Sequence, residues 1–425
     1  MNILFVVPYV PNLVRVRSYN LIRFLSEHGN RVTVVTLWST DAERKDISRL
    51  RQICHQVRAI HLPRRRSLWN GLKALPTNAP LQSVYSWHPA LAGELQPALA
   101  QSQNGRPSFD LVHVEHLRGV RYGLQLVTQA ANDRQQNAPP VVWDSVDCIS
   151  LLFRQASTQS RSRTGRIITN LDLKRTEQYE AWLTTQFDNI LLTSPRDEEA
   201  FLELVAKYEI SSRRSKFTVL PNGVDLNYFQ PDTLQVRDPC TAVVTGKMSY
   251  HANVTMVLHL VKRIMPLIWA KRPKFLLKIV GKDPSRELRV LNQHPQIEVT
   301  GTVDDIRPYL RSATVALAPI TYSAGIQNKV LEAMACATPV VTTPMAVSAL
   351  TVKVGRDLLI AEEPEDFADA VLSLLDNPAR CQSLGANGRR YVEEQHNWKN
   401  IAARLESVYR DVVHHTRQQT AAIST

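Results

Sequence analysis

Hydrophobic residues recur along this chain in short, nearly continuous runs, and the segments between the runs are amphipathic with a helical period. Such runs are typical of parallel strands that are buried on both faces. In the first half they predict strands at 3–7, 31–37, 56–62, 111–115, 140–146, 189–194 and 217–220. In the second half they predict strands at 241–245, 275–280, 297–300, 314–319, 339–343 and 358–361. Alternation of strands with helices predicts an α/β protein with two doubly wound parallel sheets.

Local signals mark several helix ends. Gly29 follows a helix expected over 17–28, and glycine is favoured just past a helix end. Ser194 is placed to cap a helix that has Pro195 in its first position. Further helices are expected near 167–184, 254–270, 304–311 and 327–336.

The 425 residues exceed the ~100–200 that usually form one core, so two domains are expected. A turn at 221–225 opens an irregular segment that extends to Pro239. We therefore place the first domain at 1–222 and the second at 223–397. Ligands of such sheets bind at the carboxyl ends of the strands, which predicts a cleft between the domains.

The chain ends in a long amphipathic segment. A helix at 398–416 is expected to pack back on the first domain, and 418–425 is expected to be frayed.

Amino-acid composition restricts the expected cellular compartment and the expected classes of binding partner. The net charge of +12 favours anionic partners, but no zinc-finger spacing or aromatic RNA-binding motif supports nucleic acid. The five cysteines are scattered, which predicts a reduced cytoplasm and no structural metal. No apolar run approaches the ~18–20 residues that span a bilayer, and the first residues look like a core strand rather than a signal peptide. We expect a cytoplasmic protein, with peripheral attachment to the inner face of the membrane as an open alternative.

The segment 323–341 carries the clearest chemistry. Gly325 ends a buried strand, and a helix is expected to open near Gln327. The N–H groups of Gly325, Ile326, Gln327 and Asn328, with the positive end of the helix dipole, suit a phosphate. Lys329 adds a full charge that the dipole alone disfavours, so an anion is expected beside it. Glu332 lies one turn later in an apolar helix and could accept hydrogen bonds from sugar hydroxyls; the alternative is an ordinary solvated glutamate.

A second set of candidates lies in the first half. Strand alternation puts His113 and Glu115 on one face, and His116 follows the strand end, where functional groups usually lie. Each could instead be a structural residue. The remaining candidates on this acceptor side are Arg15, Arg17, Asp144 and Asp147. Asp304 and Asp305 are interpreted as helix-capping residues, and no metal site is predicted.

Two basic segments suggest an anionic membrane surface: Arg64–Arg66, followed by tryptophan and leucines, and Arg161–Arg166. The alternative for the first segment is a solvated loop whose Trp69 faces the core.

In order and spacing, several motifs resemble the retaining GT-B glycosyltransferases of family 4, over nearly the whole chain. The motifs are the turn at 221–225, the loop 245–250, the strand ends 279–281 and 299–303, and the segment 325–341. The Gly-Ile-Gln-Asn-Lys sequence and the early Arg-Ser-Tyr at 17–19 are similar to a bacterial subgroup linked to exopolysaccharide and surface-glycan synthesis.

The resemblance implies a donor site for a nucleotide-diphosphate sugar and no metal or other cofactor. It assigns the donor phosphates to the loop of Gly246 and Lys247 and to Lys329, places Thr302 and Val303 beside the nucleotide, and gives Glu332 the ribose. It also implies that one of the histidines near 113–116 supports the reaction. Two departures stand out. Ala324 replaces the first of the family's two glutamates, and no lysine or arginine follows the first phosphate loop at 250–253.

The function implied is transfer of a sugar to a hydroxyl of a glycan, lipid-linked or small-molecule acceptor, with retention of configuration. The departing phosphate would accept the acceptor's proton in a front-face attack. The alternatives are a sugar phosphorylase or nucleotide-sugar epimerase of the same fold, or a non-catalytic nucleotide-sugar-binding protein.

Overall fold

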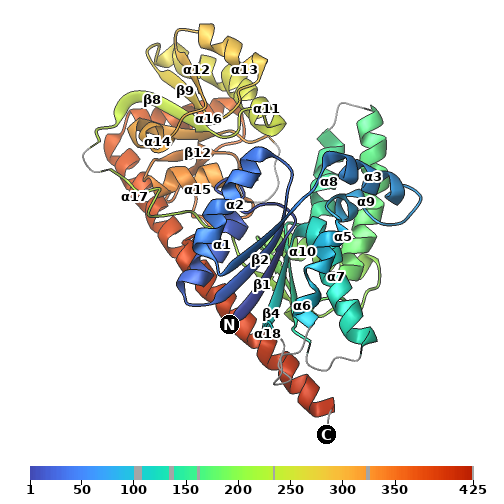
Figure 1. Ribbon diagram of the computed structural model, residues 1–425. Helices are drawn as coiled ribbons and strands as arrows, with labels where there is room; N and C mark the ends of the chain where they lie inside the picture. The colour runs from blue at the N-terminus through green and yellow to red at the C-terminus, as the bar shows by residue number, and fades with distance from the viewer. Residues whose placement is uncertain (100–107, 134–137, 160–162, 233–234, 322–325, 424–425) are drawn as a thin grey trace. The chain divides into compact units, whose positions relative to one another are not determined.

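The computed structural model describes residues 1–425 except 100–107, 134–137, 160–162, 233–234, 322–325 and 424–425 (Figure 1). It divides into two compact units. The first comprises Met1–Pro221 together with Trp398–Thr425, and the second comprises Asn222–Asn397. The chain therefore passes from one unit to the other twice.

The first unit is built on a parallel sheet of order β3-β2-β1-β4-β5-β6-β7. The strands are β1 (Asn2–Val7), β2 (Arg31–Trp38), β3 (Gln56–His61), β4 (Leu111–Glu115), β5 (Val141–Val146), β6 (Asn189–Leu192) and β7 (Phe217–Val219). The helices are α1 (Val16–Glu27), α2 (Asp41–Ile53), α3 (Arg64–Ala74), α4 (Leu81–Tyr85), α5 (Pro89–Gly93), α6 (Gln96–Leu99), α7 (His116–Asn132), α8 (Ile149–Gln159), α9 (Arg163–Leu183), α10 (Pro195–Lys207) and α18 (Trp398–Ile423).

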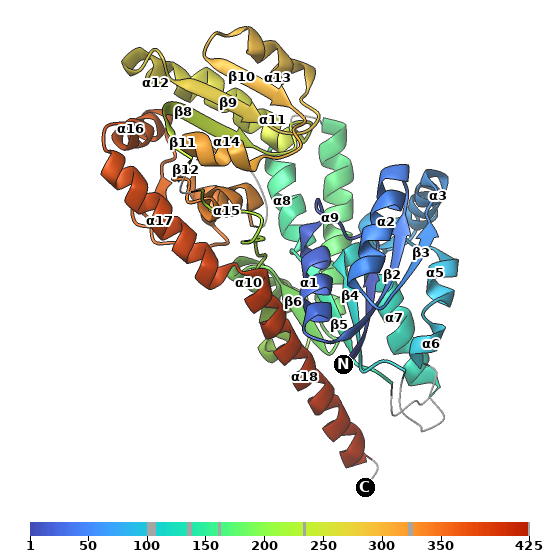
Figure 2. The ribbon, with the colours of Figure 1, turned by 60° about the vertical axis from the view of Figure 1, so that its left-hand side comes forward.

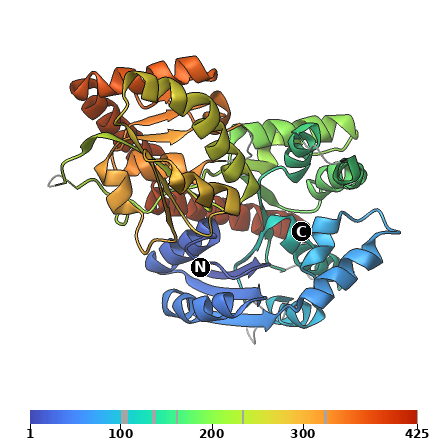
Figure 3. The same cartoon turned by 90° about the horizontal axis from the view of Figure 1, so that it is seen from above.

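Side-chain alternation along β1 gives this sheet two cores. Ile3 and Phe5 pack against α1 and α18, whereas Leu4 and Val6 pack on the side of α7 and α10. Helices therefore cover both faces of the blue-to-green sheet, as the view from above shows (Figure 3). Helix α18 lies against α1 and buries Trp398 in the first of these cores (Figure 2).

The second unit is built on a parallel sheet of order β10-β9-β8-β11-β12-β13 around one core. The strands are β8 (Asp238–Thr245), β9 (Leu276–Val280), β10 (Ile297–Gly301), β11 (Ala313–Ala318), β12 (Val340–Thr342) and β13 (Leu359–Ile360). The helices are α11 (His251–His259), α12 (Met265–Lys271), α13 (Arg286–Val290), α14 (Arg307–Ser312), α15 (Asn328–Ala335), α16 (Pro364–Leu375) and α17 (Pro378–Gln395).

The strands predicted from the sequence are confirmed, with ends that differ by up to three residues. The two predicted helix ends are also confirmed: Gly29 has φ +84°, and Ser194 Oγ accepts the Asp197 N–H at 3.2 Å. One helix needs correction. The single helix expected over 254–270 is interrupted by a π-helical turn at Leu260–Ile264, just before Pro266. Proline lacks an N–H and clashes with the preceding turn, so the regular α-helical hydrogen bonding is interrupted before it.

Candidate functional site

In each sheet the strand order reverses at one point, between β1 and β4 in the first unit and between β8 and β11 in the second. The carboxyl ends of the two strands at such a point are where ligands of parallel α/β sheets usually bind. The candidate residues are described for each unit separately.

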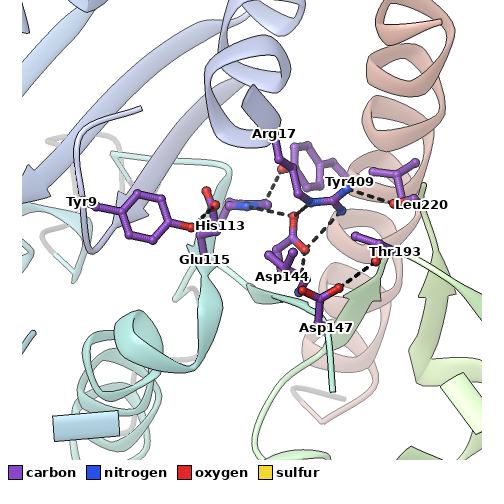
Figure 4. Close-up of polar contacts among 10 residues, drawn as sticks. Tyr9, Arg17, His113, Glu115, Asp144, Asp147, Thr193, Leu220 and Tyr409 are labelled. Atoms are coloured by element: carbon purple, nitrogen blue, oxygen red, sulfur yellow. Dashed lines mark hydrogen bonds and ion pairs between the residues drawn. The ribbon is translucent and has the colours of Figure 1, made fainter. Parts of the chain in front are cut away.

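Tyr9 and Glu115 lie at the point of reversal in the first unit. Tyr9 follows β1, Glu115 ends β4, and the Tyr9 hydroxyl donates to Glu115 Oε1 at 2.6 Å (Figure 4). Glu115 is only 2% exposed, and its Oε2 makes no hydrogen bond of ordinary geometry to the described residues. Burial, followed by the nearby charge of Asp144, raises the pKa of Glu115 to about 7. A buried carboxyl with an unsatisfied oxygen is costly, so this position is a candidate for contact with a ligand.

Arg17 and Asp144 form a buried ion pair beside this group. Arg17 Nε donates to Asp144 Oδ2 at 2.8 Å, and Nη2 donates to Oδ1 at 3.1 Å (Figure 4). Arg17 also donates to the backbone oxygen of Leu220 at 2.9 Å. Both side chains are nearly inaccessible, so the pair joins α1 to β5 instead of meeting a ligand directly.

His113 lies inside the same network. Its ring stacks on Phe5 at 4.2 Å, and its Nδ1 is 2.7 Å from the hydroxyl of Tyr409 on α18. Its Nε2 is 3.7 Å from Asp144 Oδ2. Burial lowers the pKa of His113 to about 4, so the ring is neutral at neutral pH. A neutral ring with its proton on Nε2 faces the carboxylate and leaves Nδ1 to accept from Tyr409.

His116 opens α7 and is the more accessible histidine. Its φ is +63°, a left-handed conformation that is costly for a residue other than glycine. Its Nδ1 accepts the Arg118 N–H at 3.3 Å. Burial, followed by the charge of Arg118, lowers the pKa of His116 to about 4. His116 is therefore a neutral group held in a strained position beside Glu115.

Of the other two acceptor-side candidates, Arg15 lies over the Tyr9 ring, with its guanidinium carbon 4.5 Å from the ring centre, and Asp147 lies beside Thr193. Arg15 is half-exposed and pairs with Glu43 of α2 at 2.8 Å. Asp147 accepts the Thr193 hydroxyl at 3.1 Å, and burial raises its pKa to about 6.

In the second unit, the loops after β8 and β9 lie in contact. The Gly246 N–H donates to the Val280 oxygen at 3.2 Å, and the Met248 N–H donates to the Lys282 oxygen at 2.8 Å. A side chain at Gly281 would place its Cβ only 1.7 Å from the Gly246 oxygen. This close approach requires glycine and fixes the backbone of the 246–248 loop.

Asn253 joins this loop to the candidate phosphate helix. Its Nδ2 donates to the Lys247 oxygen at 3.0 Å, and its Oδ1 accepts from Lys329 Nζ at 2.7 Å. A loop at the end of β8 and the first turn of α15 are thus held together at the point where the strand order reverses. The side chain of Lys247 itself is exposed.

The two ionisable groups of α15 lack a full set of protein partners. Burial lowers the pKa of Lys329 to about 8, and the charge of Glu332 opposes this. Burial raises the pKa of Glu332 to about 7, and the charge of Lys329 opposes this. Within the described residues the Glu332 carboxylate makes no hydrogen bond or ion pair, although the Glu332 backbone oxygen accepts the Cys336 N–H at 3.2 Å. Asn328 Oδ1 is also buried without a hydrogen bond there.

The remaining donor-side candidates have simpler surroundings. Helix α15 begins at Asn328 with Gln327 as its cap, and Ile326 is buried. Thr302 and Val303 follow β10, whose Gly301 oxygen accepts the Gly281 N–H at 3.3 Å. Gly325 and Ala324 lie outside the described residues. Asp305 accepts from the side chain and the N–H of Arg307, but Ile306 occupies the N-cap position of α14, so the helix begins later than the expected start at Asp304.

Sequence reasoning missed Tyr9, Asn253 and Tyr409. Asn253 stands in the segment 250–253, which lacks lysine and arginine, and no local pattern indicates that its amide binds Lys329. The prediction that the last helix returns to the first domain was the only signal for Tyr409. No local signal pointed to Tyr9.

Residues 239–377 match the family model described as Glycosyl transferases group 1. This part of the chain is a group 1 glycosyltransferase domain. It contains the 246–248 loop, Asn253, Lys329 and Glu332, so the whole network around Asn253 lies within the matched residues.

Sequence relatives of the chain include several named glycosyltransferases. The MMP alpha-(1->4)-mannosyltransferase of Mycolicibacterium hassiacum is 31% identical over 206 residues, which are 46% of this chain and 48% of the relative. A GDP-mannose-dependent monoacylated alpha-(1-6)-phosphatidylinositol monomannoside mannosyltransferase of Corynebacterium glutamicum is 26% identical over 45% of this chain and 55% of its own length. The chain thus spans about half of the length of these relatives.

Solved structures are similar over nearly the whole chain. Anabaena HepE in complex with UDP has a TM-score of 0.64 at 13% identity, covering 97% of this chain and 100% of HepE. The sucrose-phosphate synthase of Thermosynechococcus elongatus has a TM-score of 0.64 at 19% identity, covering 98% and 100%. At such low identity the similarity shows the fold, and the group 1 domain is therefore the second half of a GT-B fold.

Proposed function

We propose that the protein transfers a sugar from a nucleotide-diphosphate sugar to a hydroxyl group of a glycan, lipid-linked or small-molecule acceptor. The observation that supports this most directly is the Lys247–Asn253–Lys329 network at the reversal point of the group 1 domain. It brings a cation, a fixed loop backbone and a helix N-terminus to one place, which suits a diphosphate. The relatives named for mannosyl transfer and the neighbour solved with UDP agree with this proposal.

The chemical task of this network is to stabilise the departing nucleoside diphosphate. Lys329 sits against the positive end of its own helix, where a bound anion would compensate it. Fixed donors of this kind are commonly worth ~10²–10³ in rate for one group. Lys329 and the backbone N–H groups would take the place of a metal ion, so we propose a metal-independent reaction.

The acceptor chemistry is assigned to the first unit. Neutral His116 and Tyr9, whose hydroxyl binds buried Glu115, are partly exposed polar groups at its reversal point, whereas His113, Arg17 and Asp144 hold the site in position. We expect retention of anomeric configuration, with the departing phosphate accepting the proton of the attacking hydroxyl. Arg15, which lies over the Tyr9 ring, and Asp147, which lies beside Thr193, are also proposed to contact the acceptor.

A thermal-shift screen with UDP-glucose, GDP-mannose and ADP-glucose tests the donor proposal. A donor present at 100 times its dissociation constant should raise the free energy of unfolding by about 2.7 kcal/mol. Binding of a donor therefore gives a clear thermal shift. Lys329→Ala should lose the shift, whereas Lys274→Ala, an exposed lysine of the same unit, should keep it. If none of the three donors shifts the wild-type protein, the donor proposal fails.

We also assign a membrane-facing role to α3. The alternative of a solvated loop with an inward Trp69 is wrong, because residues 64–74 form a helix and Trp69 is 57% exposed. Leu68, Leu72 and Leu75 share the i, i+4, i+7 face and are also exposed, beside Arg64–Arg66. An exposed apolar face with a basic border suits an anionic bilayer surface. The side chains of Arg161–Arg166 lie outside the described residues, and no helix in the described part of the chain is long and apolar enough to cross a membrane.

Vesicle flotation tests this role. Replacing Arg64, Arg65 and Arg66 by glutamate should abolish flotation with vesicles that contain 30% phosphatidylglycerol. The same change at Lys45, Arg49 and Arg51, which are exposed on α2, is the matched control and should keep most of it. Equal losses in both variants would show only a net-charge effect.

A further inference from the structure

A cavity of about 590 Å³ lies in the first unit between α3, the segment around α4, and α7. Arg66, Lys73 and Arg121 line it, together with Trp69, Trp87 and Asn70. Neither an aspartate nor a glutamate is among its described lining residues, and none of its three cations makes an ion pair within the described part of the chain. A concave surface with three unpaired cations attracts an anion strongly, because its walls also limit screening by water.

Hydrogen bonds and ring contacts between neighbouring elements hold the walls of this cavity in place. Asn70 Nδ2 donates to the Trp87 oxygen at 2.9 Å, which joins α3 to the segment after α4. The Trp87 ring stacks on Tyr122 of α7 at 4.9 Å, and the Tyr122 hydroxyl donates to the Ser86 oxygen at 2.7 Å. These contacts fix the wall and floor before any ligand binds.

The cations and the indoles are arranged in pairs. The Arg121 guanidinium lies over the Trp87 ring at 5.1 Å, and Lys73 Nζ lies over the Trp69 ring at 5.2 Å. Arg121 and Arg66 both act on the pKa of buried Tyr122, and Arg66 also acts on His88. The two arginines therefore reach the same region from α7 and from α3.

The cavity is close to the reversal point of the sheet. Arg121 is on α7, five residues after His116, which is about 7.5 Å along a helix axis. Helix α3 follows β3 and so leaves the same carboxyl edge at which Glu115 ends β4. A group bound in the cavity would thus be held near the proposed acceptor chemistry.

We propose that this cavity is a subsite for a phosphate group of the acceptor, and that the acceptor is a phosphate ester. This inference rests on the proposed glycosyl transfer and names the class of its acceptor. Arg121 and Arg66 would bind phosphate oxygens, since guanidinium groups suit that geometry, and Lys73 would add charge at the mouth. The indole faces would pack on the sugar, polyol or chain that carries the phosphate.

Two sources supply this chemistry, a soluble phosphate ester or the headgroup of a membrane lipid. The experiment uses glycerol 3-phosphate for the first and vesicles with 30% phosphatidylglycerol for the second, against pure phosphatidylcholine vesicles. Binding is followed by tryptophan fluorescence, because Trp69 and Trp87 line the cavity. The full-length protein is used without donor.

Arg121→Gln and Arg66→Gln should each lower the affinity for the phosphate probe by about tenfold or more. Arg49→Gln, an exposed arginine of α2 with the same change of charge, should bind the probe as the wild type does. Circular dichroism and donor thermal shifts verify that each variant is folded.

Failure of the subsite is distinguishable from failure of the glycosyltransferase proposal. If neither probe changes the fluorescence, or if Arg49→Gln weakens binding as much as Arg121→Gln, the subsite is overturned while donor binding is untouched. If glycerol 3-phosphate binds and is lost in the cavity variants, the acceptor is a soluble ester. Loss with the vesicles alone in Arg121→Gln, which lies outside the basic set Arg64–Arg66, points to a lipid.

Discussion

The two reversal points of the molecule differ in how their charges are balanced. In the first unit, Arg17 and Asp144 bind each other, and Tyr409 and Tyr9 bind His113 and Glu115. In the second unit, Lys329 has one neutral amide as its hydrogen-bond acceptor, and the carboxylate of Glu332 has no hydrogen bond within the described residues. The first unit therefore contains a polar network whose charged groups are paired with one another. In the group 1 domain, Lys329 and Glu332 lack such partners, and a ligand can supply them.

Breaking the buried ion pair of the first unit should have the largest effect. Arg17→Ala leaves Asp144 buried without its partner, which typically costs about 3–5 kcal/mol in the free energy of unfolding. Urea denaturation measures it. Arg15→Ala removes a half-exposed pair and should cost below about 1 kcal/mol. Equal costs would contradict the contrast between the buried and the exposed pair.

The close contact of the two loops in the group 1 domain gives the next largest effect. Gly281→Ala forces the loop of Gly246 away, and we expect a loss of about 2–4 kcal/mol with weaker donor binding. The control is Gly71→Ala in α3, where the added methyl meets open space and should stabilise the helix by up to about 1 kcal/mol. A Gly281→Ala protein with normal stability and donor affinity would contradict the role of the loop.

A smaller effect is expected at His113. Tyr409→Phe removes the hydroxyl beside Nδ1 and leaves that buried atom unpaired, at a cost of about 1–3 kcal/mol. Tyr19→Phe, for which no hydrogen bond is found in the described structure, should change stability by less than about 0.5 kcal/mol. The two unfolding curves, measured side by side, test whether α18 completes the network of the first unit.

The smallest effect is a pH dependence at Glu332. Its folded-state pKa of about 7 exceeds the ordinary value of 4.5, so the native protein holds a proton that the unfolded chain releases between these values. This contribution is fully present below about pH 4.5 and is lost as pH rises through 7. Compared with Glu332→Gln, whose amide does not titrate, the wild type should therefore lose about 1–2 kcal/mol of stability between pH 5 and pH 8. A constant difference across this range would show that Glu332 is already paired.

The sequence predicted the strands well because buried parallel strands are continuous apolar runs, and such runs are visible locally. The family resemblance implied that Gly246, Lys247, Lys329 and Glu332 form one donor-side group, and the structure links the Lys247 backbone to Lys329 through Asn253. The sequence could not predict the pairing of Arg17 with Asp144, although both were candidates, since 127 residues separate them.

Tyr409 and His113 are separated by 296 residues, and Asn253 and Lys329 by 76. Such partners are set by packing of distant elements and leave no local pattern. The π-helical turn before Pro266 was missed for a different reason, because the apolar period continues through it.

The most direct test of the central claim is the affinity for the nucleotide-sugar donor as a function of pH in the wild type, Lys329→Ala and Lys329→Arg. Lys329 has a pKa of about 8, so its charge, and with it the wild-type affinity, should decline as pH rises from 8 to 9.5. Lys329→Arg keeps a permanent charge and reports any titration of the nucleotide itself. We predict that Lys329→Ala binds the donor at least ~10-fold more weakly at pH 7 and lacks the lysine-dependent decline. Wild-type affinity in Lys329→Ala at pH 7 would contradict the account.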